Sequence, residues 1–357
     1  MAQKIRVGLI FGGRSAEHEV SLASAVSVHK NLDPEKYSVL CFLIDKDGLW
    51  RAVASPLAPQ GELARGAAAA SSFLPWGRAA SGGVLEADVY FPVLHGPNGE
   101  DGTIQGLLEM ADVPYVGCGV TASALSMDKA LSKSVFRDSG LTQVRFRVLL
   151  EQDWARDRKA AARDLAGALP YPMFVKPSNL GSSVGITKAK DPQGLEAALE
   201  LAFRYDRKVV VEEGVLCREL ECSVLGNDDP KASLPGEVIP AREFYDYADK
   251  YVDGRTGFVI PAALPSALVE RIRSDAVTAF KAVDGAGMAR VDFLYAEGTD
   301  TLYLNEINTI PGFTEISMYP KLWDASGLPY PRLLDELIGL GIERHGRKRR
   351  LTDPDAR

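Results

Sequence analysis

Residues 290–312, which read RVDFLYAEGTDTLYLNEINTIPG, restrict the fold of this chain more than any other stretch. Polar and apolar residues alternate along both halves, and this period of two predicts two strands. The polar turn from Glu297 to Asp300 joins them, so we expect a hairpin. The expected faces are Arg290, Asp292 and Leu294 on the first strand, and Leu302, Leu304, Glu306 and Asn308 on the second.

A hairpin that folds about Thr299 would place Asp292 opposite Glu306, with Asn308 one step along on the same side. Two carboxylates and one amide oxygen are hard ligands, which suit Mg²⁺ better than zinc. The alternative is an ordinary half-buried hairpin whose polar side chains satisfy one another. The hairpin alone is compatible with both, so the rest of the chain has to decide between them.

Length and composition place the chain among ordinary soluble globular proteins. Its 357 residues suggest two or three domains, and 46% hydrophobic with 25% charged residues is a typical balance. The net charge of −7 gives no general attraction to nucleic acid or to an anionic membrane. We find neither a signal peptide nor an apolar run near the roughly 20 residues that span a bilayer. Four cysteines without a CxxC pair should be free thiols in a cytoplasmic protein.

The first third of the chain alternates strand and helix, which favours a parallel α/β sheet. IRVGLIF (5–11) and YSVLCFLID (37–45) predict strands, and a helical pattern lies between them from about residue 17 to 31. The early glycines lack the spacing of the dinucleotide fingerprint GxGxxG, which argues against a nicotinamide cofactor. Ala, Gly, Ser and Pro dominate residues 51–83, which predicts a surface loop without chemistry.

Two polar residues stand just beyond predicted strand ends, where parallel sheets bind ligands. Glu17 follows the first strand, and His95 ends a third, DVYFPVLHG (88–96), before a glycine-rich loop. Glu17 could equally stabilise the dipole of its helix from the first turn. His95 could be an ordinary loop histidine. Position alone does not separate these alternatives.

The most specific local pattern is YPMFVKPSNLGSSVGITKAK (171–190), a strand, a loop and a second strand. Lys176 ends the apolar strand, where a lysine is costly unless an anion meets it. Gly181, Ser182 and Ser183 offer backbone N–H groups and hydroxyls that can close over phosphate oxygens. The alternative is an ordinary hairpin with a surface loop.

On either side of this pattern lie further candidate elements. One helix should run from Thr121 to a C-cap at Gly140, with Lys129 and Lys133 on one face, where lysines are usually only solvated. The strand KVVVEEGV (208–215) could read adenine by its backbone, with Glu212, Glu213 and Glu219 as candidates for the ribose hydroxyls. The aromatic, charged segment 241–262 is either a lid or a surface loop packed by its own aromatics. A helix over 330–344 should close the fold, before a solvated basic terminus.

Seven stretches resemble, in order, the D-alanine–D-alanine ligases of the ATP-grasp superfamily, from about residue 4 to 340. They are GGRSAEHEVS, HGPNGEDGTIQG, SALSMDKALSK, FVKPSNLGSSVGI, FYDYADKY, ARVDF and NEINTIPGFTEISMYP. Each is short, but seven in this order are highly specific. The resemblance implies an α/β fold that is α+β in the ATP-binding part. Its expected divisions are a Rossmann-like substrate-binding domain (1–120), an ATP-grasp small lobe (121–214), a C-terminal lobe (215–345) with the lid loop 241–262, and a basic tail (346–357).

The implied activity is ATP-dependent ligation of two D-alanines to D-alanyl-D-alanine for peptidoglycan, through an acyl phosphate. Two Mg²⁺ or Mn²⁺ ions would be held by Asp292, Glu306 and Asn308. The family's phosphate contacts match Lys129, Lys176, Gly181, Ser182, Ser183 and Lys250, and its adenine and ribose contacts match Glu212, Val215 and Glu219. The family also implies a homodimer.

The resemblance places further residues at the two D-alanines. Glu17 would bind the ammonium group of the first, while Arg290 and the N–H of Gly312 would stabilise the oxyanion. Ser317, with Met318 beside it, would hold the carboxylate of the second, and His95 would lie nearby. Ser182 and Tyr251 would hydrogen-bond together with Glu17 and close the lid. Ligases that make D-alanyl-D-lactate usually carry phenylalanine at the position of Tyr251, so a tyrosine there favours the dipeptide.

Two other functions compete with this one. Another ATP-grasp carboxylate–amine ligase would take a different amino acid, or D-lactate, as second substrate; Glu17 and the Ser182–Tyr251 pair argue against it. A regulatory module that binds ATP without catalysis would not need the oxyanion arginine, Arg290, together with the metal ligands.

Overall fold

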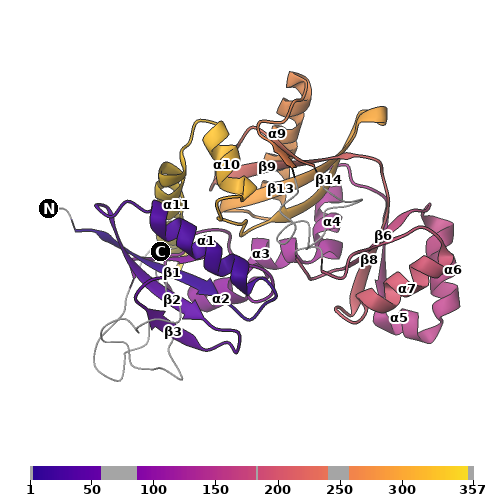
Figure 1. The fold of residues 1–357 in the computed structure, drawn as a ribbon, viewed down its shortest axis with the longest axis horizontal. Coiled ribbons are helices and arrows are strands. Elements are labelled where there is room, and N and C mark those ends of the chain that lie inside the picture. The colour runs from indigo at the N-terminus through magenta and orange to yellow at the C-terminus, as the bar shows by residue number, and fades with distance from the viewer. Residues whose placement is uncertain (1–2, 58–86, 182–183, 240–256, 353–357) are drawn as a thin grey trace.

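Three sheets, each covered by helices, build the molecule (Figure 1). The computed structural model describes residues 3–57, 87–181, 184–239 and 257–352, the last four by their backbone alone. Most of the Ala/Gly-rich segment 51–83, most of the expected lid 241–262 and the end of the basic tail lie outside these residues. Within the described ranges, no helix is both long and apolar enough to cross a membrane.

The first sheet confirms the parallel α/β arrangement expected at the N-terminus. β1 (Ile5–Gly12) pairs in parallel with β2 (Tyr37–Ile44) and β4 (Val89–Pro92), and β3 (Trp50–Val53) adds an antiparallel edge. Alternate residues of β1 serve two cores: Leu9 packs with α1 (His18–Asn31) and α11 (Tyr330–Thr352), and Ile10 packs with α2 (Thr103–Met110). α11 therefore joins the first sheet, although it is the last helix of the chain (Figure 1).

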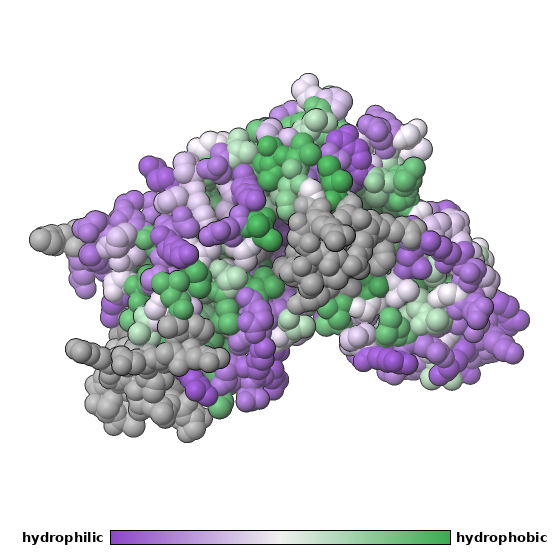
Figure 2. Space-filling view, in the orientation of Figure 1, coloured by the Kyte–Doolittle hydropathy of each residue, from purple (hydrophilic) through white to green (hydrophobic). Residues whose placement is uncertain are grey.

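An antiparallel sheet with the order β5-β8-β6-β7 forms a separate body. Its strands are β5 (Phe146–Leu150), β8 (Lys208–Glu213), β6 (Met173–Pro177) and β7 (Thr187–Ala189). The helices α5 (Glu151–Arg156), α6 (Arg158–Ala168) and α7 (Pro192–Ala202) contribute to its apolar core. Their outer surface is mostly hydrophilic (Figure 2). The expected strand–loop–strand pattern at 171–190 is confirmed, because β6 and β7 pair antiparallel.

The third sheet is antiparallel, with the order β12-β11-β9-β13-β14. Its strands are β12 (Gly257–Val259), β11 (Gly236–Ile239), β9 (Arg218–Gly226), β13 (Gly287–Ala296) and β14 (Thr301–Asn308), with the short β10 (Lys231–Ala232) beside β9. α9 (Ser266–Ala282) packs on the apolar face of this sheet. α10 (Met318–Ala325), a helix that was not expected from the sequence pattern, lies against the other face, where Ser223 Oγ donates to the carbonyl of Tyr319.

The central hairpin forms with the expected pairing, but one of its expected faces is wrong. Asp292 lies opposite Glu306, as predicted, whereas Phe293 already pairs with Leu304. A β-bulge at Asn305 inserts one residue into β14. Leu302 and Leu304 are therefore buried in the core under α9, while Glu306 and Asn308 lie on the opposite face with Arg290 and Asp292.

The expected single helix over 121–140 is also wrong, because two helices lie there. α3 (Val120–Met127) ends at Asp128, whose extended backbone begins α4 (Lys129–Asp138). The Asp128 side chain accepts hydrogen bonds from the N–H groups of Ala130 and Leu131, so it caps α4. The break places Lys129 in the first turn of α4.

Candidate active site

Two cavities meet on the polar face of the third sheet. The larger, of about 670 Å³, lies between that sheet and the β5-β8-β6-β7 body, and its volume is in the range of small-molecule pockets. The smaller, of about 120 Å³, lies between the third sheet and the carboxyl ends of the first sheet. Glu221 and Glu306 line both cavities.

The described residues expected to bind ATP or metal divide between the two cavities. Those that line the larger cavity are Lys176, Glu212, Val215, Glu219, Asp292 and Glu306. Those that line the smaller, with the expected substrate residues, are Glu17, His95, Lys129, Gly181, Arg290, Glu306, Asn308, Gly312, Ser317 and Met318. Ser182, Ser183, Lys250 and Tyr251 lie outside the described residues.

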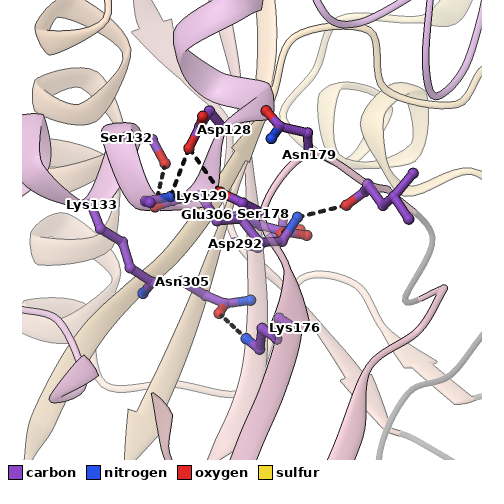
Figure 3. A network of polar contacts seen from close by, with 12 residues as sticks. Asp128, Lys129, Ser132, Lys133, Lys176, Ser178, Asn179, Asp292, Asn305 and Glu306 are labelled. Atoms are coloured by element: carbon purple, nitrogen blue, oxygen red, sulfur yellow. Dashed lines mark hydrogen bonds and ion pairs between the residues drawn. The ribbon is translucent and has the colours of Figure 1, made fainter. Parts of the chain in front are cut away.

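Glu212 is buried between two lysines at the wall of the larger cavity. Its Oε1 lies 2.9 Å from Lys133 Nζ and its Oε2 lies 2.6 Å from Lys176 Nζ. Burial alone would raise the pKa of Glu212, but the two ammonium groups outweigh it and lower the pKa to about 2. Lys176 also donates to Asn305 Oδ1 at 3.4 Å (Figure 3). Taken by themselves, these two lysines and one carboxylate carry one net positive charge, which suits an anionic ligand at Lys176, although further carboxylates line the same cavity.

The pKa values of Lys176 and Lys133 shift in opposite directions, although both lysines contact Glu212. Burial works against charge on Lys176, but Glu212 and Glu306 raise its pKa above the ordinary value. Burial dominates at Lys133, whose side chain is 1% exposed, and lowers its pKa. Lys133 is thus a buried member of the site and not the solvated lysine that such residues usually are.

Asp128 ties the start of α4 to the strand that carries Lys176. Ser178 Oγ donates to Asp128 Oδ1 at 2.8 Å, and Lys208 of β8 forms an ion pair with the same carboxylate. Ser178 also accepts the N–H of Lys129, at 2.9 Å. Lys129 Nζ then donates to the carbonyl of Leu180 at 2.7 Å (Figure 3). We call Asp128, Ser178 and Lys208 the α4 clamp; it positions Lys129 beside the loop that begins after β6.

The polar face of the hairpin holds the expected oxygen ligands. Lys129 Nζ lies 3.6 Å from Glu306 Oε2. Asp292 receives two hydrogen bonds from Arg290, both of 2.7 Å, and Asn308 Oδ1 accepts the N–H of Ile310. Among the described residues, no three His, Cys, Asp or Glu side chains form a ready metal cluster. The adjacent carboxylates of Asp292 and Glu306, with the amide oxygen of Asn308, nevertheless match the oxygen chemistry that Mg²⁺ and Mn²⁺ prefer.

At the other end of the smaller cavity, Glu17 is buried at the start of α1. It makes no side-chain hydrogen bond that caps the helix, but its place at the N-terminus of α1 remains compatible with the alternative that its charge stabilises the helix dipole. A Cβ at Gly181 would lie 3.3 Å from Glu17 Oε2, which brings the loop after β6 close to this carboxylate. Glu17 and the backbone of Gly181 thus lie beside each other in the lining of the smaller cavity.

His95 and the segment 312–318 complete the smaller cavity. His95 lies 3.6 Å from Glu100, and although burial opposes charge, Glu100 and Glu17 raise the pKa of His95. Its Nδ1 lies 3.1 Å from the carbonyl of Ile310, and its Nε2 lies 3.0 Å from Ser24 Oγ. A Cβ at Gly312 would lie 2.6 Å from Ser317 Oγ, so a larger residue there would have to displace the Ser317 hydroxyl. These contacts tie the turn after β14 to the first sheet.

Several residues of the site escaped the sequence reasoning. Asp128 directly before a helical pattern is an N-cap signal that could have located the break. Glu221 shares its strand face with Glu219, two residues earlier, so the period of two could have found it. Asn305 carries no local signal of a bulge, and Glu100 lies in a loop without periodicity.

A Rossmann-like domain followed by two antiparallel bodies, with a cavity between them, is the architecture of an ATP-grasp protein. Family models described as D-ala D-ala ligase N-terminus and D-ala D-ala ligase C-terminus match residues 6–118 and 135–339. This chain belongs to the D-alanine–D-alanine ligase family.

Similar proteins cover almost the whole chain. The D-alanine–D-alanine ligase of Bacillus cytotoxicus is 47% identical over 98% of this chain and 98% of its own. That of Thermoanaerobacter pseudethanolicus is 49% identical over 97% of this chain and 99% of its own. The solved D-alanine–D-alanine ligase from Coxiella burnetii has a TM-score of 0.84 at 37% identity and covers 98% of both chains. The VanG D-Ala:D-Ser ligase from Enterococcus faecalis has a TM-score of 0.82 at 35% identity, with 95% of this chain and 100% of its own covered.

Proposed function

We propose that this protein joins two D-alanines into D-alanyl-D-alanine and converts ATP to ADP and phosphate. The observation that carries the proposal is family membership over nearly the full chain, together with two cavities that share the wall at Glu306. One cavity has the size for a nucleotide, and the other has the size and charge for small zwitterions. The two substrate classes thus meet at one wall.

The chemistry follows from the weakness of a carboxylate as an electrophile. The carboxylate of the first D-alanine attacks the γ-phosphate of ATP, and ADP leaves. The amine of the second D-alanine attacks the resulting acyl phosphate, and phosphate leaves as the new C–N bond forms. Glu17 holds the first ammonium group, Arg290 and the N–H of Gly312 face the oxyanion, and Ser317 beside Met318 receives the second carboxylate, with His95 nearby.

The nucleotide occupies the larger cavity in this proposal. Lys129 and Lys176 meet the phosphates with Gly181, and Val215 and Glu219 meet the adenine and ribose. Glu212 has both oxygens engaged by lysines, so we infer that it positions Lys176 as well as facing the base. A divalent metal supplies charge compensation at the phosphates. We propose two Mg²⁺ or Mn²⁺ ions, held by Asp292, Glu306 and Asn308.

The remaining expectations belong to the same proposal. Ser182, Ser183, Lys250 and Tyr251 keep the roles that the resemblance implies, at the phosphates and at a lid over 241–262. The division at residues 120, 214 and 345 is likewise retained. The protein is proposed to be a cytoplasmic homodimer of the peptidoglycan pathway that needs neither nucleic acid nor membrane.

Phosphate release from ATP tests the function directly. Release should require both D-alanine and Mg²⁺, and mass spectrometry should identify D-alanyl-D-alanine as the product. L-alanine is the matched control, and equal turnover with it would contradict the proposal. D-serine and D-lactate offered as second substrates should give less product than D-alanine; a preference for either would assign the second cavity to that substrate.

A further inference from the structure

Three neighbouring strands place three carboxylates in one row. Glu221 on β9 lies opposite Asp292 on β13, and Asp292 lies opposite Glu306 on β14. The row is on the face away from α9, since the adjacent Cys222, Val291 and Ile307 are buried in the core under that helix. Asp292 and Glu306 have a proposed role as metal ligands, but Glu221 has none. It lines both cavities, and so stands where they meet.

Arg290 lies between two members of this row. Its Nε and Nη2 donate to the two oxygens of Asp292, each at 2.7 Å. Glu221 Oε2 lies 3.1 Å from the same Nε. The side chains of Arg290, Glu221 and Asp292 are 15%, 9% and 14% exposed, so water screens their charges little. Nε carries a single hydrogen, which Asp292 accepts here, and Glu221 is the next acceptor within reach.

In the proposed function, the two oxygens of Asp292 must serve both Arg290 and a divalent cation. As a metal ligand it must present at least one oxygen to the cation. That oxygen has a second lone pair for the cation, but the cation competes for its electron density and so weakens the hydrogen bond to Arg290. A buried guanidinium without a carboxylate partner is strongly unfavourable. Unless a second acid holds Arg290, metal binding would therefore either be weakened or shift the arginine from the reacting carbonyl.

We propose that Glu221 is a positioning residue, which holds Arg290 from β9 while Asp292 turns toward the divalent cation. The proposal deepens the proposed function and rests on it. The contacts support it: Arg290 lies within ion-pair distance of two carboxylates of the row, so a second acid is already in place beside the guanidinium. Glu221 thus frees Asp292 for the metal and keeps the arginine between the two cavities.

The variant Glu221→Gln tests this role, because it keeps an oxygen acceptor of the same shape and removes the charge. Binding of Mn²⁺ in the presence of ADP is measured by the electron paramagnetic resonance signal of free Mn²⁺, without turnover. We expect the Kd for Mn²⁺ to rise about tenfold, and kcat at saturating metal to fall about tenfold, since a displaced arginine aligns poorly with the carbonyl. An unchanged Kd and an unchanged kcat would overturn the proposal.

A double-mutant cycle separates positioning from a direct effect on the metal. In the Arg290→Gln background, Glu221→Gln should change neither the Kd for Mn²⁺ nor kcat any further. An equal loss of Mn²⁺ affinity in both backgrounds would show that Glu221 acts on the cation itself, which also overturns the proposal. Glu109→Gln is the matched control, because Glu109 pairs with Arg344 away from both cavities, and it should leave the Kd for Mn²⁺ unchanged.

Two further measurements separate a folding defect, and a failure of the proposed function, from a failure of the positioning role. Circular dichroism and thermal melting check that Glu221→Gln is folded; if it is not, Glu221→Asp retains the charge on a shorter side chain and should weaken Mn²⁺ binding by a smaller factor. Failure of the proposed function is read separately, from the turnover of D-alanine by the unsubstituted protein. The Mn²⁺-binding measurements of the cycle remain valid in that case, since they require only ADP and no turnover.

Discussion

At the scale of single residues, Glu212 shows how a buried charge is made tolerable. A lone carboxylate at 2% exposure would be protonated, but two ammonium groups within 3 Å keep it ionised. In return, the carboxylate allows Lys133 and Lys176 to remain buried at the wall of the cavity in which we propose that ATP binds. Removing any one member therefore changes the other two.

The pH dependence of stability should report this arrangement. The pKa of Glu212 is about 2 in the fold and 4.5 ordinarily, so its stabilising contribution is complete above pH 4.5 and is lost as pH falls toward 2. The difference corresponds to about 3 kcal/mol. Glu212→Gln should lower the free energy of unfolding by about 3–5 kcal/mol at pH 7, since two lysines stay buried without their partner. Urea unfolding at pH 7 and at pH 3 should show the gap between variant and unsubstituted protein narrowing at pH 3.

Lys133→Met provides the comparison for this prediction. It removes one buried charge and replaces it with an apolar side chain of similar length, while Glu212 keeps Lys176. Its loss of stability at pH 7 should be smaller than that of Glu212→Gln. A gap for Glu212→Gln that is equally wide at pH 3 and pH 7 would show that Glu212 does not titrate as described.

The sequence predicts which kind of partner a buried charged residue such as Lys176 needs, but it does not predict which residue that partner is. Lys176 was singled out because a lysine at the end of an apolar strand needs an anion, and it has one. That anion is Glu212, which was expected at adenine and ribose. The distances that couple Lys133, 43 positions before Lys176, to the same carboxylate depend on how α4 packs against the sheet that contains β6 and β8, and no local pattern carries that information.

At the scale of elements, the α4 clamp connects secondary structure to function. Asp128 caps α4, binds Ser178 and pairs with Lys208, so one side chain fixes a helix, a strand end and Lys129 together. Asp128→Ala should cost about 1 kcal/mol or more for the lost cap. It should also raise the KM for ATP about tenfold, because Lys129 is no longer held beside the loop after β6. Steady-state kinetics with varied ATP measure this.

Asp157→Ala is the matched control, since Asp157 caps α6 through the N–H of Ala160 in the same way. It should cost similar stability and leave the KM for ATP unchanged. If the two variants changed the KM equally, the effect would come from general destabilisation and not from the clamp.

The elements themselves followed from periodicity, with two informative failures. The hairpin and its Asp292–Glu306 pairing came from the period of two, because a polar turn fixed the register. The period of two did not predict the bulge at Asn305, because no residue type in the strand marks the inserted position. The position of the bulge depends on how Leu302 and Leu304 pack under α9. One helix is expected over 121–140, but the structure has two, because the Asp128 side chain accepts backbone N–H groups of α4 and begins a new helix there.

At the scale of the whole molecule, the ends of the chain share one core. Leu9 and Phe11 of β1 pack in the same cluster as Leu333 and Leu337 of α11. Lys36 and Tyr37 also contact Asp335 through their side chains, so polar contacts add to the apolar ones. The segment proposed as the first domain, residues 1–120, is therefore completed by the last helix.

A chain that ends at residue 328, and so lacks α11, should not fold cooperatively. It loses Leu333, Leu334, Leu337 and Ile338, each at most 1% exposed, and burial of four such side chains is worth about 6–12 kcal/mol. That is comparable with the whole stability of a typical domain, roughly 5–15 kcal/mol.

A chain that ends at residue 348 keeps these four buried side chains and the ion pair between Lys348 and Glu109, so it should melt within a few degrees of the full chain. Thermal melts followed by circular dichroism compare the two, and a sharp transition of the shorter chain at the full-length temperature would show that the first sheet folds without its C-terminal partner.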